Sequence, residues 1–290
     1  STGEIVMALD GDTSFDNDMV VNVVRHFQDP DVPAVAGSLR VRNARASLTT
    51  AMQALEYLLS IQLAKIGLSE WNVVNNVSGA FGAFRRSFLQ KIGGWDTHTA
   101  EDLDITLRIK NYFGRRPLRI PFEPRAIGHT DAPVTFRQVL MPRLRWDGDL
   151  FFLYVRKHRH SFTPRLLGWP NFLVGLVSGF FFQLVLPFII LGYFIVGLYS
   201  LTLSTFLVLA WLVYLVYLAN TLLAYVVAVC MVSERPQQDL WLCWVVPLFP
   251  LFMFVMRCWS AVAILNEMIR RGHEETSMAP WWVLRKAKRF

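Results

Sequence analysis

The sequence has 290 residues, of which 53% are hydrophobic and 18% are charged, and its formal net charge is +7. It is too apolar for an ordinary soluble domain, and its three cysteines lack the spacing of a metal site or of a disulfide framework. Residues 166–232 contain no Asp, Glu, Lys or Arg, whereas one bilayer crossing needs roughly 20 apolar residues. The sequence therefore predicts a soluble half, residues 1–165, joined to an integral membrane half, residues 166–265.

The basic residues gather on both sides of the membrane half. Arg156 and Lys157 precede it, and Lys286 and Arg289 follow it. Basic residues beside membrane spans usually mark the cytoplasmic side of the membrane. The charge therefore indicates a lipid bilayer, and no nucleic acid, as the partner, and it predicts that residues 266–290 form a basic cytoplasmic tail.

Short strands and helices alternate along the soluble half. Strands are expected at residues 4–9, 32–39, 73–77 and 117–121, and helices at residues 15–27, 47–68, 88–92 and 136–142 and after Thr99. This alternation is typical of an α/β domain with a mostly parallel sheet. Ligands of such sheets bind at the carboxyl ends of strands, so Asp10 and Ser78, which each follow a strand, are expected to reach one crevice. The small residues Ser78, Gly79 and Ala80 predict a backbone that a ligand approaches closely.

The first strand ends in Asp10-Gly11-Asp12. Two carboxylates at a strand end can hold one hard cation, Mg²⁺ or Mn²⁺, which shares its coordination with substrate phosphates. Gly11 would let a diphosphate approach the backbone. The same tripeptide is also an ordinary turn, so alone it does not decide between the two interpretations.

Residues 92–108 combine a Gly-Gly-Trp turn, a cluster of acids and a helix. A helix start concentrates unpaired N–H groups and positive dipole, which stabilise a carboxylate as an anion. Asp102 is therefore a candidate general base. The pattern of Thr99 followed three residues later by Asp102 is also that of a helix cap without catalysis. Asp104 and Arg108 lie four residues apart and are expected to form an ion pair.

The run Arg143-Leu144-Arg145-Trp146 lies just before the membrane half. A Trp at this place is often an interfacial anchor, but it can also form a flat platform for a sugar ring. The two arginines can bind a diphosphate by forked hydrogen bonds. Local sequence leaves both interpretations open.

Three long apolar segments follow, approximately at residues 172–198, 206–232 and 240–265. Three crossings would place the basic tail outside, against the usual charge rule. An even number results if the third, proline-containing segment is re-entrant, or if residues 166–232 cross three times. Arg257 in the third segment is costly unless it faces a polar cavity or snorkels to the surface.

Together, in this order, these motifs resemble those of membrane-embedded family 2 glycosyltransferases, the group that contains cellulose, hyaluronan and poly-N-acetylglucosamine synthases. The resemblance covers about residues 4–165 by motif and the remainder by architecture. It implies a GT-A-like, Rossmann-like cytoplasmic domain followed by transmembrane helices.

The resemblance also implies roles for individual residues. Asp10 and Asp12 would be ligands of Mg²⁺ or Mn²⁺, and Asp102 with Glu101 would be the catalytic pair. Arg143 and Arg145 would bind the diphosphate, and the acceptor would contact Trp146, Ser78 and Gly79. Two departures weaken the match. Pro142 stands where the family has Gln, which puts acceptor binding in doubt. The family's first nucleotide-binding strands do not precede Asp10, so the chain is expected to be the C-terminal part of a longer protein.

The implied reaction is an inverting, metal-dependent transfer from a UDP-sugar, glucose or N-acetylglucosamine, to a growing polysaccharide. The expected location is a bacterial inner membrane, crossed several times, with a cytoplasmic catalytic domain and accessory membrane subunits as further candidate partners. One alternative is a single transfer to a lipid acceptor. Another is a non-catalytic membrane scaffold or receptor subunit.

Overall fold

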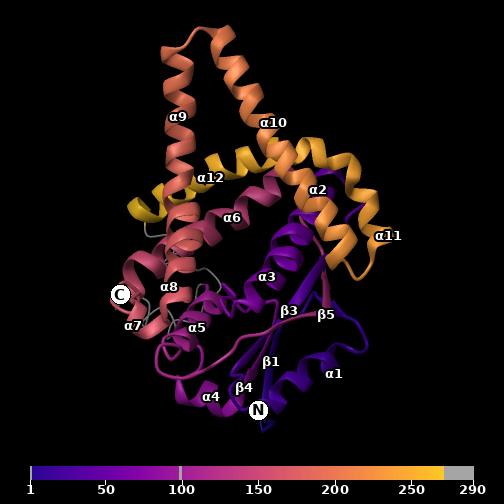
Figure 1. The fold of residues 1–290 in the computed structure, drawn as a ribbon, viewed down its shortest axis with the longest axis vertical. Coiled ribbons are helices and arrows are strands. Elements are labelled where there is room, and N and C mark those ends of the chain that lie inside the picture. Colours follow the sequence, from indigo (N-terminus) through magenta and orange to yellow (C-terminus); the bar gives the residue numbers. More distant parts are fainter. Residues whose placement is uncertain (1, 98–99, 271–290) are drawn as a thin grey trace.

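The soluble half is built around a five-stranded mixed sheet (Figure 1). The computed structural model describes residues 2–97 and 100–270. The strands are β1 (Ile5–Leu9), β2 (Ser14–Phe15), β3 (Ala34–Val41), β4 (Phe81–Arg85) and β5 (Phe122–Thr130), in the order β1-β4-β3-β5-β2. Among these described strands, β3 and β5 pair in parallel, and the other three pairs are antiparallel. The α/β class is confirmed, but the expectation of a mostly parallel sheet is wrong.

Two apolar runs that were expected to be strands of this sheet are not strands. Residues 73–77 and 117–121 form no strand. Val77 is nevertheless buried, and its N–H donates to Thr106 Oγ1 at 2.9 Å. Ile120 is also buried, and its N–H donates to Asn72 Oδ1 at 3.1 Å. Side chains thus accept the backbone hydrogen bonds that a neighbouring strand would otherwise accept. An apolar run indicates that its residues are buried, but it does not indicate that they pair in a sheet.

The helices of the soluble half cover the sheet and lead towards the membrane half. They are, with 3-10 or π segments marked η, α1 (Met19–Val24), η1 (Arg25–Gln28), α2 (Leu48–Tyr57), η2 (Leu58–Leu63), α3 (Ala64–Glu70), α4 (Arg86–Lys91), α5 (Glu101–Lys110), α6 (Phe136–Phe151), η3 (Phe152–Lys157) and α7 (Pro164–Leu167). The expected long helix at residues 47–68 is confirmed as the continuous run α2-η2-α3. Ser47 caps it, since the N–H of Thr50 donates to Ser47 Oγ at 3.1 Å.

Helix α6 continues through Pro142 to Phe151, so the prediction that it ends at this proline is wrong. A proline removes one backbone hydrogen bond from a helix interior. Here α6 is held on both sides of Pro142 by helix α12 (Phe249–Arg270). Trp259 Nε1 donates to Leu140 O at 2.8 Å, and Ser260 Oγ donates to Asp147 Oδ2 at 2.7 Å. These tertiary contacts stabilise the helix against the local preference of proline.

Three continuous helices are long and apolar enough to cross a bilayer within the described part of the chain. They are Trp169–Ser200, Leu203–Val232 and Pro236–Arg270. They comprise α8 (Trp169–Val174), η4 (Gly175–Val185), α9 (Leu186–Ser200), α10 (Leu203–Val227), η5 (Ala228–Val232), α11 (Pro236–Asp239), η6 (Leu240–Leu248) and α12. Residues 166–232 contain two of these long helices, so the alternative of three crossings there is wrong. The third helix continues past residue 265 to Arg270, and residues 271–290 of the expected tail lie outside the described residues.

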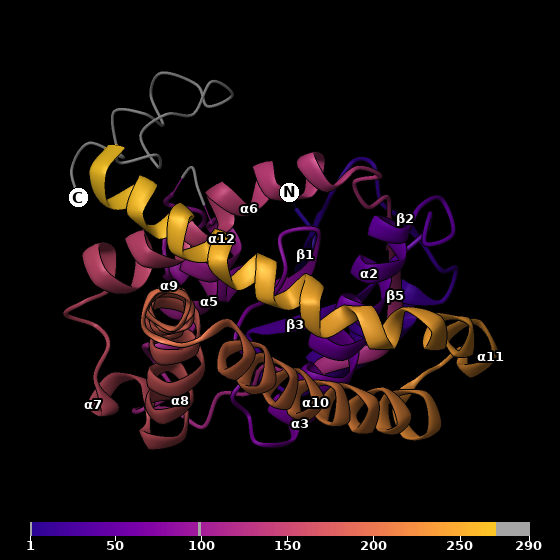
Figure 2. The same cartoon turned by 90° about the horizontal axis from the view of Figure 1, so that it is seen from above.

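The third long helix is arranged differently from the first two. Helices α9 and α10 extend away from the sheet, whereas α12 lies across them and alongside α6 (Figures 1 and 2). Arg257 of α12 donates to Gln183 Oε1 at 2.8 Å and to Phe182 O at 3.2 Å. This arginine therefore has polar partners on η4, as the polar-cavity interpretation requires.

Candidate active site

A cavity of about 600 Å³ lies between the sheet, α5, α6 and η4. Its wall contains seven of the predicted site residues, which are Asp10, Ser78, Gly79, Glu101, Asp102, Arg145 and Trp146. The N–H of Asp10 donates to Ala80 O at 3.3 Å, which joins the end of β1 to the segment before β4. The fold thus brings together residues that are up to 136 positions apart (10 to 146) in the sequence.

Asp102 is held in this wall by three hydrogen bonds to its carboxylate. Leu103 N donates to Oδ1 at 2.7 Å, while Asn76 Nδ2 and Gly79 N donate to Oδ2 at 3.2 and 3.3 Å. Such bonds stabilise the anion and fix its direction. Ala100 occupies the N-cap position with a left-handed backbone, φ +44°. Thr99, the alternative cap, lies outside the described residues.

Gly79 lies close to the side chain of Glu101. A Cβ at this position would lie 2.7 Å from Glu101 Oε1. Glycine therefore lets the backbone N–H reach Asp102 while Glu101 packs beside it. Burial raises the pKa of Glu101, with a smaller contribution from the charge of Asp102, while the nearby Arg145 guanidinium opposes this rise.

Asp10 adds a third carboxylate to the cavity. Partial burial raises its pKa, and the charges of Asp12 and Asp102 raise it further. A divalent cation would relieve this repulsion, and carboxylate oxygens are the ligands that Mg²⁺ and Mn²⁺ prefer. No three His, Cys, Asp or Glu side chains form a metal site by themselves in residues 2–97 and 100–270. The carboxylates of Asp10 and Asp12, completed by diphosphate oxygens and water, would fit the usual coordination of Mg²⁺.

Two predicted site residues lie off the cavity wall. Asp12 is exposed, and its Oδ1 accepts a long hydrogen bond of 3.5 Å from Thr13 Oγ1. Arg143 forms an ion pair with Glu56 of α2. Residues two apart in a helix point to different faces, so Arg143 and Arg145 diverge although the motif names them together. The roles of both residues stay predictions.

The cavity also contains residues that the motifs did not indicate. Lys65 is buried and donates to Asn76 O at 3.1 Å, and Asn76 in turn donates to Asp102. Burial lowers the pKa of Lys65 to about 8, against the opposing charge of Asp102. Asn76, Lys110, Asp149 and Tyr154 lie on the wall, whereas Lys65 lies behind it and contacts the wall residue Asn76. One signal was present for Asn76, since it is one of two adjacent polar residues inside the otherwise apolar run at residues 73–77.

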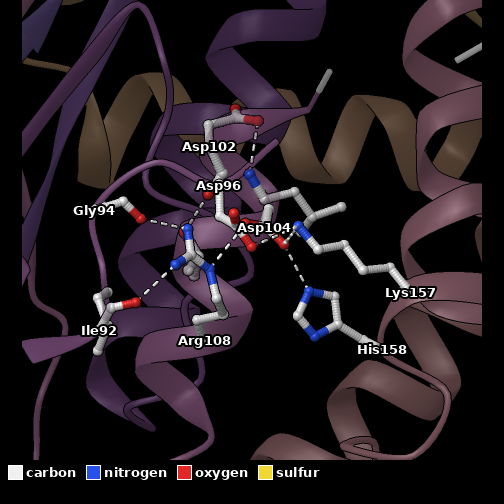
Figure 3. Close-up of polar contacts among 10 residues, drawn as sticks. Ile92, Gly94, Asp96, Asp102, Asp104, Arg108, Lys157 and His158 are labelled. Carbon is white, nitrogen blue, oxygen red and sulfur yellow. Dashed lines mark hydrogen bonds and ion pairs between the residues drawn. The ribbon is translucent and has the colours of Figure 1, made fainter. Parts of the chain in front are cut away.

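Asp104 forms a separate buried cluster on the other side of α5 (Figure 3). Its carboxylate is fully buried and accepts from Arg108 Nε at 2.9 Å, which confirms the expected pair. Lys157 Nζ lies 2.8 Å and His158 Nε2 lies 2.7 Å from Oδ1. Burial alone would raise the pKa of Asp104, but the hydrogen bond from His158 and the charges of Lys157 and Arg108 lower it to about 2.

Arg108 extends this cluster to the turn before α5. It donates to Ile92 O at 2.9 Å and to Gly94 O at 2.6 Å (Figure 3). Gly93 and Gly94 have φ of +84° and +67°, which side-chain-bearing residues rarely adopt. The turn and the first part of α5 are thereby fixed to one another, so that Asp102 points away from the Asp104 cluster.

The fold and the site together define a membrane-linked α/β domain with an acidic cavity suited to cation-assisted group transfer. The profile of the glycosyl transferase family group 2 matches residues 5–269, and the chain belongs to that family.

Curated relatives share part of this chain. The poly-beta-1,6-N-acetyl-D-glucosamine synthase of Staphylococcus epidermidis is 32% identical over 145 residues, which are 49% of this chain and 34% of that protein. The protein of the same name from Staphylococcus aureus is also 32% identical over 145 residues, with the same coverage of 49% and 34%. The matched stretch therefore spans about a third of the length of these relatives.

The Asp104 cluster predicts a stability that depends on pH. Because the folded-state pKa lies below the ordinary value of 3.8, the carboxylate stabilises the fold above pH 3.8. This stabilisation, roughly 2 kcal/mol, is lost as pH falls towards 2. Asp104→Asn leaves buried cations unpaired, so it is expected to lower the free energy of unfolding by about 3–5 kcal/mol at pH 7. Denaturant unfolding of the detergent-solubilised protein measures both effects.

Asp18→Asn is the matched control, since the Asp18 side chain makes no capping hydrogen bond in α1. Its free energy of unfolding is expected to stay within about 0.5 kcal/mol of the wild type. Equal stability of the two variants would contradict the structural role of Asp104.

Proposed function

We propose that the protein is an inverting glycosyltransferase that moves a sugar from a UDP-sugar to a growing polysaccharide at the membrane. The observation that carries this proposal is one cavity that holds the triply hydrogen-bonded Asp102 together with Asp10 and Trp146. Family membership supports the class of reaction. The name of the staphylococcal relatives favours N-acetylglucosamine over glucose as the transferred sugar.

Asp102 acts as the general base in this proposal. Its carboxylate accepts the proton of the acceptor hydroxyl while the hydroxyl oxygen forms a bond to the anomeric carbon of the donor sugar. The bond between that carbon and the diphosphate oxygen breaks on the opposite face, so the configuration inverts. The electron pair leaves with UDP. Gly79 and Asn76 keep Asp102 in place through the hydrogen bonds described above.

Asp10 and Asp12 would hold Mg²⁺ or Mn²⁺. When bound, this cation neutralises charge that grows on the leaving diphosphate. Arg145 lies on the cavity wall, where its guanidinium adds positive charge. Trp146 is 49% exposed, which leaves its ring free to stack against an acceptor sugar. Arg143 is proposed to contribute indirectly, since it is bound to Glu56.

The proposed location is a bacterial inner membrane, with the catalytic half on the cytoplasmic side. The three long apolar helices support insertion in a bilayer. The number of crossings, accessory membrane subunits and the basic tail at residues 266–290 belong to the same proposal.

A single transfer to a lipid acceptor is the second candidate. It is favoured by the cavity wall, which includes Val174, Gly175 and Gly179 of the first apolar helix. A lipid in the bilayer could reach the cavity along this helix. The length of radiolabelled product made by the full-length protein separates the two candidates. Polysaccharide synthesis is expected to give long chains, and a single added sugar on lipid would contradict it.

Asp102→Asn tests the assignment of the base. The variant keeps the size of the side chain but cannot accept the proton, so transfer is expected to fall about 10²–10⁴-fold. Binding of UDP, measured by calorimetry on the full-length protein, is expected to change less than about twofold. The exposed Asp18→Asn serves as the control for activity. Wild-type turnover in Asp102→Asn would refute the assignment.

Asp12→Asn and Asp10→Asn test the cation site. Both are expected to weaken binding of UDP in the presence of Mn²⁺, because one ligand of the cation is lost. Binding measured in EDTA is expected to be equally weak in the wild type and in both variants. Retention of the full Mn²⁺ effect in both variants would show that the cation binds elsewhere.

A further inference from the structure

Lys110 is a buried cation on the cavity wall that the proposed chemistry does not use. It is the last residue of α5 and is 6% exposed. Within residues 2–97 and 100–270 no hydrogen bond or ion pair involves the Lys110 side chain, and its Nζ is not one of the fully buried unpaired atoms, so this nitrogen reaches the cavity. The other buried lysine of the cavity region, Lys65, differs in this respect because it donates to Asn76 O.

A buried lysine without a counter-ion is unfavourable in its charged form, so such a group is normally paired or loses its proton. Burial is the one cause that lowers the pKa of Lys110, to about 7, and no carboxylate is close enough to raise it. Lys110 is therefore remote from Asp10 and Asp102. Along the axis of α5 it lies about 12 Å from Asp102, given a rise of 1.5 Å per residue. An anion at Lys110 would thus be separate from the diphosphate at Asp10.

The end of α5 adjoins the start of the first apolar helix. Gly114 N donates to Leu166 O at 2.8 Å, three residues before the helix Trp169–Ser200 begins. A Cβ at Gly114 would lie 2.0 Å from Arg165 O, so the two segments are in close backbone contact. Val174 of the apolar helix lies on the same cavity wall as Lys110. The cavity therefore extends from the catalytic acids to the edge of the membrane half.

A second donor, Tyr154, lies on the cavity wall. Tyr154 packs its ring edge-on against Phe162, with centroids 5.6 Å apart. A Cβ at Gly179 would lie 2.6 Å from Tyr154 Oη, which places the phenol next to η4. Burial raises the pKa of Tyr154 to about 12, so its hydroxyl stays protonated and can donate. Lys110 and Tyr154 are thus two donors on the wall of a cavity that also holds the carboxylates of Asp10, Glu101, Asp102 and Asp149.

We propose that Lys110 determines specificity by binding an anionic group, a phosphate or a carboxylate, on the acceptor that occupies this cavity. This inference rests on the proposed glycosyltransferase function. An anion on the acceptor would supply the counter-ion that the protein lacks and favour the charged form of Lys110, and Tyr154 is a second donor on the wall of the same cavity. A phosphate would come from a lipid phosphate that enters beside the apolar helix. A carboxylate would come from a uronic acid in a polysaccharide.

Three acceptors test the inference with the full-length protein in phosphatidylcholine nanodiscs. They are undecaprenyl phosphate, an oligosaccharide ending in glucuronic acid, and a neutral N-acetylglucosamine tetramer, each with UDP-N-acetylglucosamine and with UDP-glucose. The variants are Lys110→Met, which keeps length without charge, and Lys110→Arg, which keeps charge. Lys91→Met is the control, because Lys91 is exposed and stacks on Phe88 and Tyr112 away from the cavity wall.

The wild type is expected to have a lower KM for one anionic acceptor than for the neutral tetramer. Lys110→Met should raise that KM about 10- to 100-fold, the usual loss for a charged hydrogen bond, with little change in kcat. Lys110→Arg should retain most of the preference, and Lys91→Met all of it. The KM for the neutral tetramer should not change. The responding acceptor identifies phosphate or carboxylate as the anion.

Four outcomes would overturn the inference. One is a wild type without preference for either anionic acceptor, and another is an equal effect of Lys110→Met on anionic and neutral acceptors. The unfolding temperatures of all variants are measured in parallel. A loss of preference for the anionic acceptor that accompanies a loss of stability in both Lys110 variants also counts against the inference. If the wild type transfers sugar to none of the acceptors and releases no UDP, the proposed function itself fails. Transfer without sensitivity to Lys110 rejects the anion site alone.

Discussion

The buried carboxylate of Asp104 is the interaction on which the geometry of the cavity depends. Arg108 of α5 and the adjacent Lys157 and His158 at the end of η3 surround it. A buried carboxylate without such partners would be strongly destabilising. Since all partners must be in place at once, α5, the turn before it and η3 can assume one mutual arrangement. Asp102 lies two residues before Asp104, so the same arrangement fixes the direction of the Asp102 side chain.

Three of the five charged residues of helix α5 therefore lie in three different surroundings. Asp102 receives hydrogen bonds at the open cavity, Asp104 is paired inside the protein, and Lys110 is buried without a partner. Charge that is paired within the protein contributes to the fold. Charge that is unpaired within the protein is available to a ligand. This difference in pairing separates the groups that stabilise the fold from the groups that can bind a ligand.

The cavity is also coupled to the apolar helices. Helix α6 presents Arg145 and Trp146 to the cavity, and α12 holds the same helix through Trp259 and Ser260. Arg257 of α12 binds Gln183, which lies on the cavity wall. A movement of the third apolar helix would thus reach both Trp146, the proposed sugar platform, and the cavity wall through direct contacts.

The sequence by itself determined the features that depend on short stretches. The charge-free run at residues 166–232, the acids after the first strand and the Asp104–Arg108 pair each need only neighbours along the chain. Tertiary structure decided the rest. Antiparallel pairing of β4, the continuation of α6 through Pro142, the turn of Arg143 towards Glu56 and the partners of Asp104 all require contacts between distant segments. Local patterns report burial, charge and periodicity, whereas the choice of partner is made by the packed fold as a whole.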